Sequence, residues 1–103
     1  MATTDEKDFI MERLYFLLEE KRVFLDGEKC DREIVRVTGM CLRELDKIVL
    51  DRTGVNLNII INLYRIQQAR DLLAAGVEYE AVWSLSGFES VKAMDRAFED
   101  IVG

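Results

Sequence analysis

The chain has 103 residues, which suits a single domain, and half of them are hydrophobic, enough for a compact core at this size. It contains no proline and only six glycines, so it lacks the turn residues that an all-β domain needs. Histidine is absent, which removes the commonest general base and the commonest metal ligand. We therefore expect an all-α domain that is not an enzyme and has no catalytic, cofactor-binding or metal site. The net charge of −6 also argues against nucleic-acid binding, which usually uses a basic surface.

No apolar stretch reaches the roughly 18 residues that a membrane span needs. Residues 1–7 are polar and acidic, whereas a secretory signal is basic and then apolar. Cys30 and Cys41 are accordingly expected to be reduced thiols. These features predict a cytoplasmic protein without membrane contact.

The spacing of apolar residues predicts three helices in the first half of the chain. The first covers about residues 5–22, with Thr4 or Asp5 as its N-terminal cap. Its inward stripe consists of Ile10, Leu14, Leu17 and Leu18, widened by Phe9, Tyr15 and Phe16. After a turn at residues 25–27, helices over residues 31–38 and 42–52 are separated by Gly39 and closed by Gly54.

Three more helices are expected in the second half. A long helix over residues 56–75 has apolar residues at steps of three and four, namely Ile59, Leu63, Ile66, Ala69, Leu72 and Leu73. Helices over residues 78–85 and 90–102 follow, with Gly87 between them. The run over residues 59–61, with Leu63 and Tyr64, is wider than one helical stripe. Part of it is therefore either core or a contact surface.

An internal repeat is the most informative feature of the sequence. Residues 45–54 and 94–103 share a ten-residue pattern: a large apolar residue, aspartate, a basic residue, an apolar residue at the fifth position and a final glycine. Upstream of each segment lies a glycine followed by an apolar residue, in Gly39-Met40 and Gly87-Phe88. A short helix, a glycine turn and a second helix thus occur twice, about 48 residues apart. This order is the layout of a DNA-binding helix-turn-helix.

The repeat predicts how the domain is organised. We expect a single domain over residues 1–103, with helix-turn-helix subdomains in residues 1–54 and 77–103. A linker helix in residues 55–76 joins them.

In this order and spacing, the motifs resemble the DNA-binding domain of the AraC family of transcription regulators. The first unit of that family typically reads Gly, a capping Ser, Leu-Ser-Arg-Leu-Phe-Lys-Lys and a late Gly. Residues 45–54 match that frame, with Cys41 at the capping position. The family's linker helix carries Arg-Leu, Ala and Leu-Leu, matched here by Arg65-Ile66, Ala69 and Leu72-Leu73. Its second unit shows Gly-Phe and Phe-x-Arg-x-Phe-Lys-Lys, matched by Gly87-Phe88, Met94, Arg96, Phe98 and Gly103.

The resemblance implies an all-α fold of six to seven helices, with two homeodomain-like helix-turn-helix units on one linker helix. It implies that the third and last helices are recognition helices, placed in successive major grooves roughly 34 Å apart. The chain would then bind two adjacent half-sites of double-stranded DNA, as the sequence-specific domain of a bacterial transcription regulator. The positions that match the DNA-contacting ones are Arg43, Asp46, Lys47, Val91, Lys92, Asp95 and Arg96.

The residue types at these positions suit different contacts. Arg43 and Lys47 can donate to guanine O6 and N7, and Arg96 suits a phosphate. Asp46 and Asp95 can accept only from a base amino group, such as cytosine N4. Outside the family frame, each of these side chains is most often a solvated charge on a helix.

The second unit departs from the family pattern in its charge. Residues 78–103 hold two basic and six acidic side chains, and Glu99 and Asp100 replace the usual Lys-Lys. Phosphate neutralisation supplies much of the affinity of proteins for DNA. The alternative is therefore a degenerate AraC-like module with weak or no DNA binding, used for protein–protein interaction.

Two bulky residues, Val35 and Trp83, stand where the family usually has a small alanine in the first helix of each unit. Either the core is repacked around them, or Trp83 is an exposed anchor for a partner. The apolar linker helix is the other surface expected to hold a protein partner or a second copy.

Overall fold

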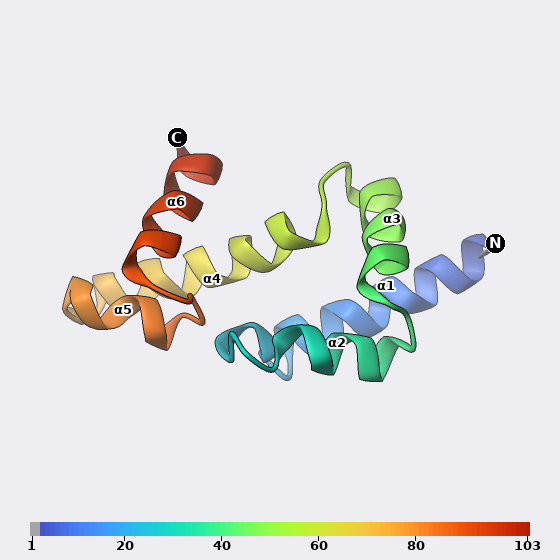
Figure 1. Ribbon diagram of the computed structural model, residues 1–103, viewed down its shortest axis with the longest axis horizontal. Helices are drawn as coiled ribbons and strands as arrows, with labels where there is room; N and C mark the ends of the chain where they lie inside the picture. The colour runs from blue at the N-terminus through green and yellow to red at the C-terminus, as the bar shows by residue number, and fades with distance from the viewer. Residues whose placement is uncertain (1–2) are drawn as a thin grey trace.

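The computed structural model describes residues 3–103, and it is built from α-helices (Figure 1). The α-helices are α1 (Thr4–Glu19), α2 (Cys30–Thr38), α3 (Leu42–Thr53), α4 (Leu57–Ala74), α5 (Tyr79–Leu85) and α6 (Val91–Val102). A short 3-10 helix, η1 (Val23–Leu25), follows α1. No strand occurs among the described residues, so the expected all-α class of six to seven helices is confirmed. In the same residues, no helix is both long enough and apolar enough to cross a membrane.

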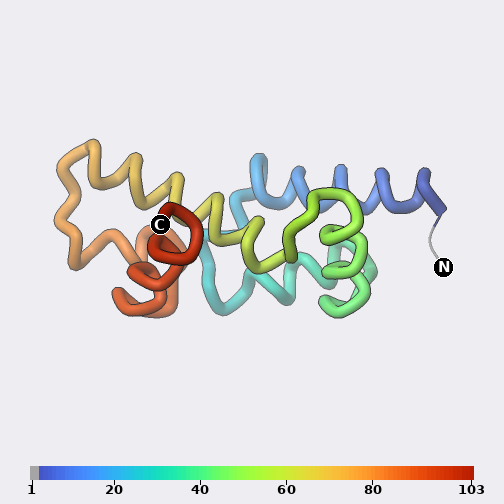
Figure 2. The backbone as a smooth tube through the Cα atoms, turned by 90° about the horizontal axis from the view of Figure 1, so that it is seen from above, coloured from blue at the N-terminus to red at the C-terminus, as the bar shows by residue number. Residues whose placement is uncertain are grey.

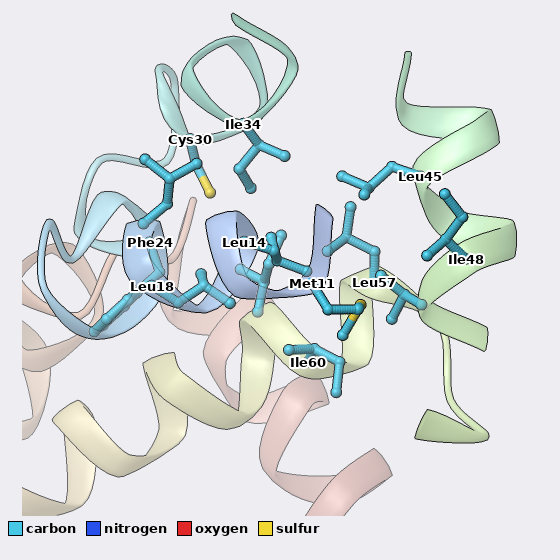
Figure 3. Packing of buried hydrophobic residues seen from close by; sticks show 13 residues of the cluster. Met11, Leu14, Leu18, Phe24, Cys30, Ile34, Leu45, Ile48, Leu57 and Ile60 are labelled. Carbon is cyan, nitrogen blue, oxygen red and sulfur yellow. The ribbon is translucent and has the colours of Figure 1, made fainter. Parts of the chain in front are cut away.

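The molecule is elongated, with extents of 45 × 25 × 19 Å, and α4 runs along its middle (Figures 1 and 2). Its buried side chains form two separate clusters. The first cluster joins α1, η1, α2 and α3 to the start of α4, and Figure 3 shows its side chains converging. The second cluster joins the end of α4 to α5 and α6; its buried members are Ile66, Ala69, Val82, Phe88, Met94 and Ala97.

The first helix differs from the expectation at both ends. Its cap is Thr3 rather than Thr4 or Asp5, because the Thr3 hydroxyl accepts the Glu6 amide at 3.2 Å. It ends at Glu19 rather than near residue 22. The chain reverses through Arg22, whose φ of 52° is left-handed, and this reversal brings Phe24 into the first cluster. Burial of a large aromatic side chain offsets the cost of leaving the helix early.

The inward face of α1 is also narrower than expected. Leu14, Leu17 and Leu18 are buried, but Phe9 and Phe16 are about half exposed, at 55% and 49%. The predicted widening of the stripe by these two rings is therefore wrong. Their rings lie beneath cations instead, with the Arg13 guanidinium carbon 4.7 Å from the Phe9 ring centre.

The face that α4 buries changes along its length. Leu57, Ile60 and Ile61 enter the first cluster, whereas Ile66 and Ala69 enter the second. The single predicted stripe fails for this reason: Leu63 and Leu73 lie in it and are exposed, at 43% and 37%. A helix that packs against two cores on different sides cannot follow one apolar stripe.

The sequence repeat has a matching repeat in structure. α3 and α6 both have 12 residues and begin 49 residues apart, and each ends at a left-handed glycine, Gly54 or Gly103. Ile34 of α2 and Val82 of α5, which are 48 residues apart, are both fully buried in the preceding helices. Trp83 is half-buried and packs against the second cluster, which agrees with the repacked-core interpretation.

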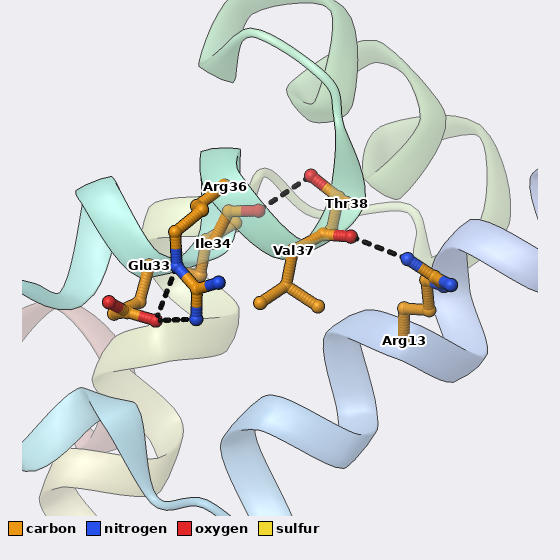
Figure 4. Close-up of polar contacts among 6 residues, drawn as sticks. All are labelled: Arg13, Glu33, Ile34, Arg36, Val37 and Thr38. Carbon is orange, nitrogen blue, oxygen red and sulfur yellow. Dashed lines mark hydrogen bonds and ion pairs between the residues drawn. The ribbon is translucent and has the colours of Figure 1, made fainter.

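A polar contact ties the C-terminal end of α2 to α1 (Figure 4). The Arg13 guanidinium donates to the Val37 carbonyl oxygen at 2.7 Å, and so satisfies an acceptor in the last turn of α2. The Thr38 hydroxyl donates to the Ile34 carbonyl at 2.6 Å. Arg13 and the Thr38 hydroxyl thus satisfy two carbonyl oxygens near the C-terminal end of α2, just before the turn to α3.

Candidate nucleic-acid interface

Helix α3 stands at the N-terminal end of α4, and α6 rises from the second half of α4 (Figure 1). Both are seen nearly end-on when the molecule is turned by 90°, so their axes run in similar directions (Figure 2). Each helix is held by its inner face: Leu45, Ile48 and Val49 are buried in α3, and Met94 and Ala97 in α6. The opposite face of each helix is left to solvent.

The exposed faces of the two helices carry the same arrangement of cations. Arg43 and Lys47 are four residues apart in α3, and Lys92 and Arg96 occupy the positions 49 residues later in α6. All four side chains are exposed. Residues four apart lie on one side of a helix, so each pair forms a small basic patch. We call these the α3 patch (Arg43 and Lys47) and the α6 patch (Lys92 and Arg96).

Most of these cations have no acidic partner within the fold. Arg43, Lys92 and Arg96 make no ion pair with another side chain in residues 3–103. Lys47 pairs with Glu44 at 3.4 Å, but both side chains are more than half exposed. An exposed pair of this kind is worth little and is easily exchanged for an external anion. Both patches are therefore open to a negatively charged ligand.

Asp46 lies between the two cations of the α3 patch but makes a contact inside the fold. Its carboxylate accepts the backbone amide of Leu57, the first residue of α4, at 2.7 Å. The Asn56 side chain accepts another free amide of the same first turn, that of Ile59, at 2.9 Å. A carboxylate at a helix N-terminus also benefits from the helix dipole. Asp46 thus fastens α3 to the start of the long helix.

Asp95 is the equivalent residue of α6, and it too is held from within. The Tyr79 hydroxyl, at the start of α5, donates to the Asp95 carboxylate. This bond joins the start of α5 to α6, and so links the two helices of the second pair. Val91, the remaining predicted contact residue, is the first residue of α6 and is half-buried.

The structure thus brings the seven predicted residues onto two similar helix faces, three on α3 and four on α6. Leu50 and Glu99 were not among the predicted contact residues, but they are exposed and lie one further turn along the same faces. Their spacing of three or four residues from Asp46, Lys47, Asp95 and Arg96 could have indicated them. The C-terminal part of the exposed face is therefore apolar in α3, at Leu50, and acidic in α6, at Glu99.

Charge is unequal around the two patches. Residues 28–54 hold six basic and six acidic side chains, whereas residues 78–103 hold two and six, a net charge of −4. Near the end of α3, Asp51 is paired with Lys7 of α1 at 3.2 Å. The α3 patch therefore has the more favourable surroundings for an anion.

No candidate metal site accompanies these patches: in residues 3–103, His, Cys, Asp and Glu side chains form no group of three that could hold an ion. Comparison with protein-family models, with curated proteins and with solved structures gives no match.

Proposed function

We propose that the chain is a sequence-specific DNA-binding domain of the AraC type, acting in a bacterial transcription regulator. The observation that carries this proposal is the duplicated basic patch. Two helices, each held by its inner face against the rest of the fold, present cations at equivalent positions of the repeat.

The dimensions of the molecule support two contacts with one duplex. The 18 residues of α4 span about 27 Å at 1.5 Å per residue. Both reading helices lie along this length, with α3 at the first end of α4 and α6 against its second half, so one chain can present both to a single duplex. In this proposal the α3 patch contacts guanine edges, and the α6 patch contributes mainly phosphate contacts.

The test is selection from a pool of random duplexes at low salt, followed by affinity measurements on a selected duplex. Replacing Arg43 and Lys47 by glutamine should weaken binding by at least about tenfold, because a good base contact is worth roughly 1–3 kcal/mol. Replacing Lys92 and Arg96 should have a smaller effect, since the surroundings of that patch are acidic. Replacing Lys21 and Arg70, which lie outside both patches, makes the same change in net charge and serves as the control.

Equal losses in all three double variants would mean that only net charge matters, and sequence-specific reading by α3 would then be wrong.

A second function is favoured by one observation, a shallow apolar groove of about 380 Å³ between α1 and α4. It is lined by Tyr15, Ile60, Leu63, Tyr64 and Gln67. Together with the charge of −4 in residues 78–103, it supports a module that binds protein, for example a second copy of itself. Under this alternative, sedimentation equilibrium should show a dimer that Leu63→Asp abolishes.

A further inference from the structure

The two helix pairs meet at a junction where backbone lies against backbone. On the first side is the segment from η1 to the start of α2; on the second side is the turn between α5 and α6. Arg65 of α4 lies between them, and its Nε donates to the Phe24 carbonyl oxygen at 2.9 Å. Beside it, Arg22 donates to the Gln68 side chain at 2.6 Å.

Two glycines, one from each side, make this close approach possible. A Cβ atom on Gly87 would lie 1.9 Å from the Phe24 carbonyl oxygen, and one on Gly27 would lie 2.8 Å from the Gly87 carbonyl oxygen. In both cases the obstacle is backbone, which cannot turn aside as a flexible side chain can. A side chain at either position therefore requires the two halves of the molecule to move apart.

The close approach belongs to the junction and not to the glycine turn itself. Gly39 takes the place of Gly87 in the first helix pair, and both are left-handed, with φ of 71° and 90°. A Cβ atom on Gly39 would have nothing within 4 Å. The two glycines thus share a left-handed backbone conformation, but only Gly87 also lies against the backbone of another segment.

We propose that the contact of Gly27 and Gly87, held by the bond from Arg65 to Phe24, fixes α6 relative to α3 and thereby sets the spacing of the two half-sites. The inference rests on the proposed DNA-binding function. Gly27, Arg65 and Gly87 are positioning residues in it: they touch no DNA, and they act through the helices they hold.

A fixed junction makes half-site spacing a strict requirement. Each inserted base pair moves the second half-site by about 3.4 Å along the duplex and also rotates it around the axis. A chain whose two reading helices form one rigid body cannot follow that movement without losing contacts at one patch. A loosened junction can follow it.

The first arm of the test measures the junction without DNA. Spin labels are attached at Leu50→Cys in α3 and Glu99→Cys in α6, two exposed and equivalent positions, in a Cys41→Ser background. Cys30 is buried and stays unlabelled. The distance distribution between the labels is then recorded for three variants. Gly27→Ala introduces a clash with the Gly87 carbonyl oxygen but places alanine at no left-handed position. Gly39→Ala places alanine at a left-handed position but causes no clash. Gly87→Ala does both.

We expect one narrow distribution for the parent and for Gly39→Ala, and a displaced or broadened one for Gly27→Ala and Gly87→Ala. Circular dichroism confirms that each variant keeps its helices. Gly27→Ala is decisive, because it lies outside the turn between α5 and α6 and tests the contact even where Gly87→Ala does not fold. An unchanged distribution in folded Gly27→Ala would overturn the proposal.

The second arm uses a duplex selected from the random pool and the same duplex with three base pairs inserted between its half-sites. The insertion should weaken binding of the parent by about tenfold or more, and binding of Gly27→Ala by much less. Equal penalties for both proteins would also overturn the proposal. If the pool yields no bound duplex although the label distances respond, the DNA-binding function fails and the junction stands. If duplex is bound but the distances do not respond, the junction fails and the function stands.

Discussion

Asp46 and Asp95 occupy equivalent positions in the repeat, and both carboxylates accept a hydrogen bond from another part of the fold. The donors differ: the Leu57 amide at the start of α4 for Asp46, and the Tyr79 hydroxyl at the start of α5 for Asp95. These contacts account for two acidic residues in the middle of otherwise basic patches. The carboxylates hold neighbouring helices in place while the flanking cations face outward.

The role of Asp46 can be tested through stability. Asp46→Ala should lower the free energy of unfolding by about 1 kcal/mol, the usual cost of losing a cap at a helix N-terminus. Urea denaturation measures the change. The matched control is Asp100→Ala, which removes an exposed aspartate of α6. Equal stability of the two variants would show that the bond to Leu57 contributes nothing.

Cys30 should make stability depend on pH in alkaline solution. Its thiol is buried in the first cluster, and burial raises its pKa from 9.0 to about 11, an effect that the nearby Arg65 partly offsets. The folded state therefore keeps a proton that the unfolded state releases. The stabilisation is present below pH 9 and is lost as the pH rises towards 11, by about 1.4 kcal/mol per pH unit at most.

Urea denaturation of the parent and of Cys30→Ala, compared at pH 8 and pH 10.5, isolates this effect. The stability difference between the two proteins should shrink as the pH rises. A difference that stays constant would mean that Cys30 ionises equally in the folded and unfolded chain.

At the scale of whole elements, the two reading helices begin with different caps. Ser90 caps α6 by accepting the Ala93 amide at 3.0 Å, whereas Cys41, the equivalent residue of α3, makes no such bond. Cys41→Ser should therefore stabilise the protein by up to about 1 kcal/mol, and Ser90→Ala should destabilise it by about the same amount. Thermal unfolding measures both changes, and a lower melting temperature for Cys41→Ser would contradict the assignment of this cap.

The helices could be predicted from sequence because their ends coincide with glycines and polar caps. The C-terminal end of α1 could not be predicted, because the chain leaves that helix to bury Phe24. The stabilisation from this burial depends on tertiary packing, which no local sequence signal reports. The single stripe predicted for α4 failed for a related reason. Apolar spacing reveals one buried face, but α4 packs against two clusters on different sides.

The candidate interface could likewise be predicted from the sequence only in part. The cations of both patches follow from helical spacing and from the repeat, which are local. The bonds of Asp46 and Asp95 were not predictable, because their donors lie 11 and 16 residues away and depend on how the helices pack. The close approach of Gly27 and Gly87 spans 60 residues and could be seen only in three dimensions.

At the scale of the whole molecule, charge and shape together define the proposal. The two patches lie on separate helices of an elongated body, and the second helix pair holds only two basic side chains against six acidic ones. We therefore predict unequal contributions to DNA binding, with most of the affinity in α3 and a weaker second contact in α6. Because few cations are available for phosphate contacts in a chain of net charge −6, binding should be weak and should depend only shallowly on salt concentration.

The most direct test is binding of the native chain to a selected duplex between about 50 and 200 mM salt, the range in which phosphate contacts are lost. With two to four cations at the DNA backbone, the logarithm of the binding constant should fall with the logarithm of salt concentration with a slope of about −2 to −4. The variant with glutamine at Lys92 and Arg96, which supply mainly phosphate contacts, should show a shallower slope. Failure to retain any duplex at the lowest salt concentration would contradict the account.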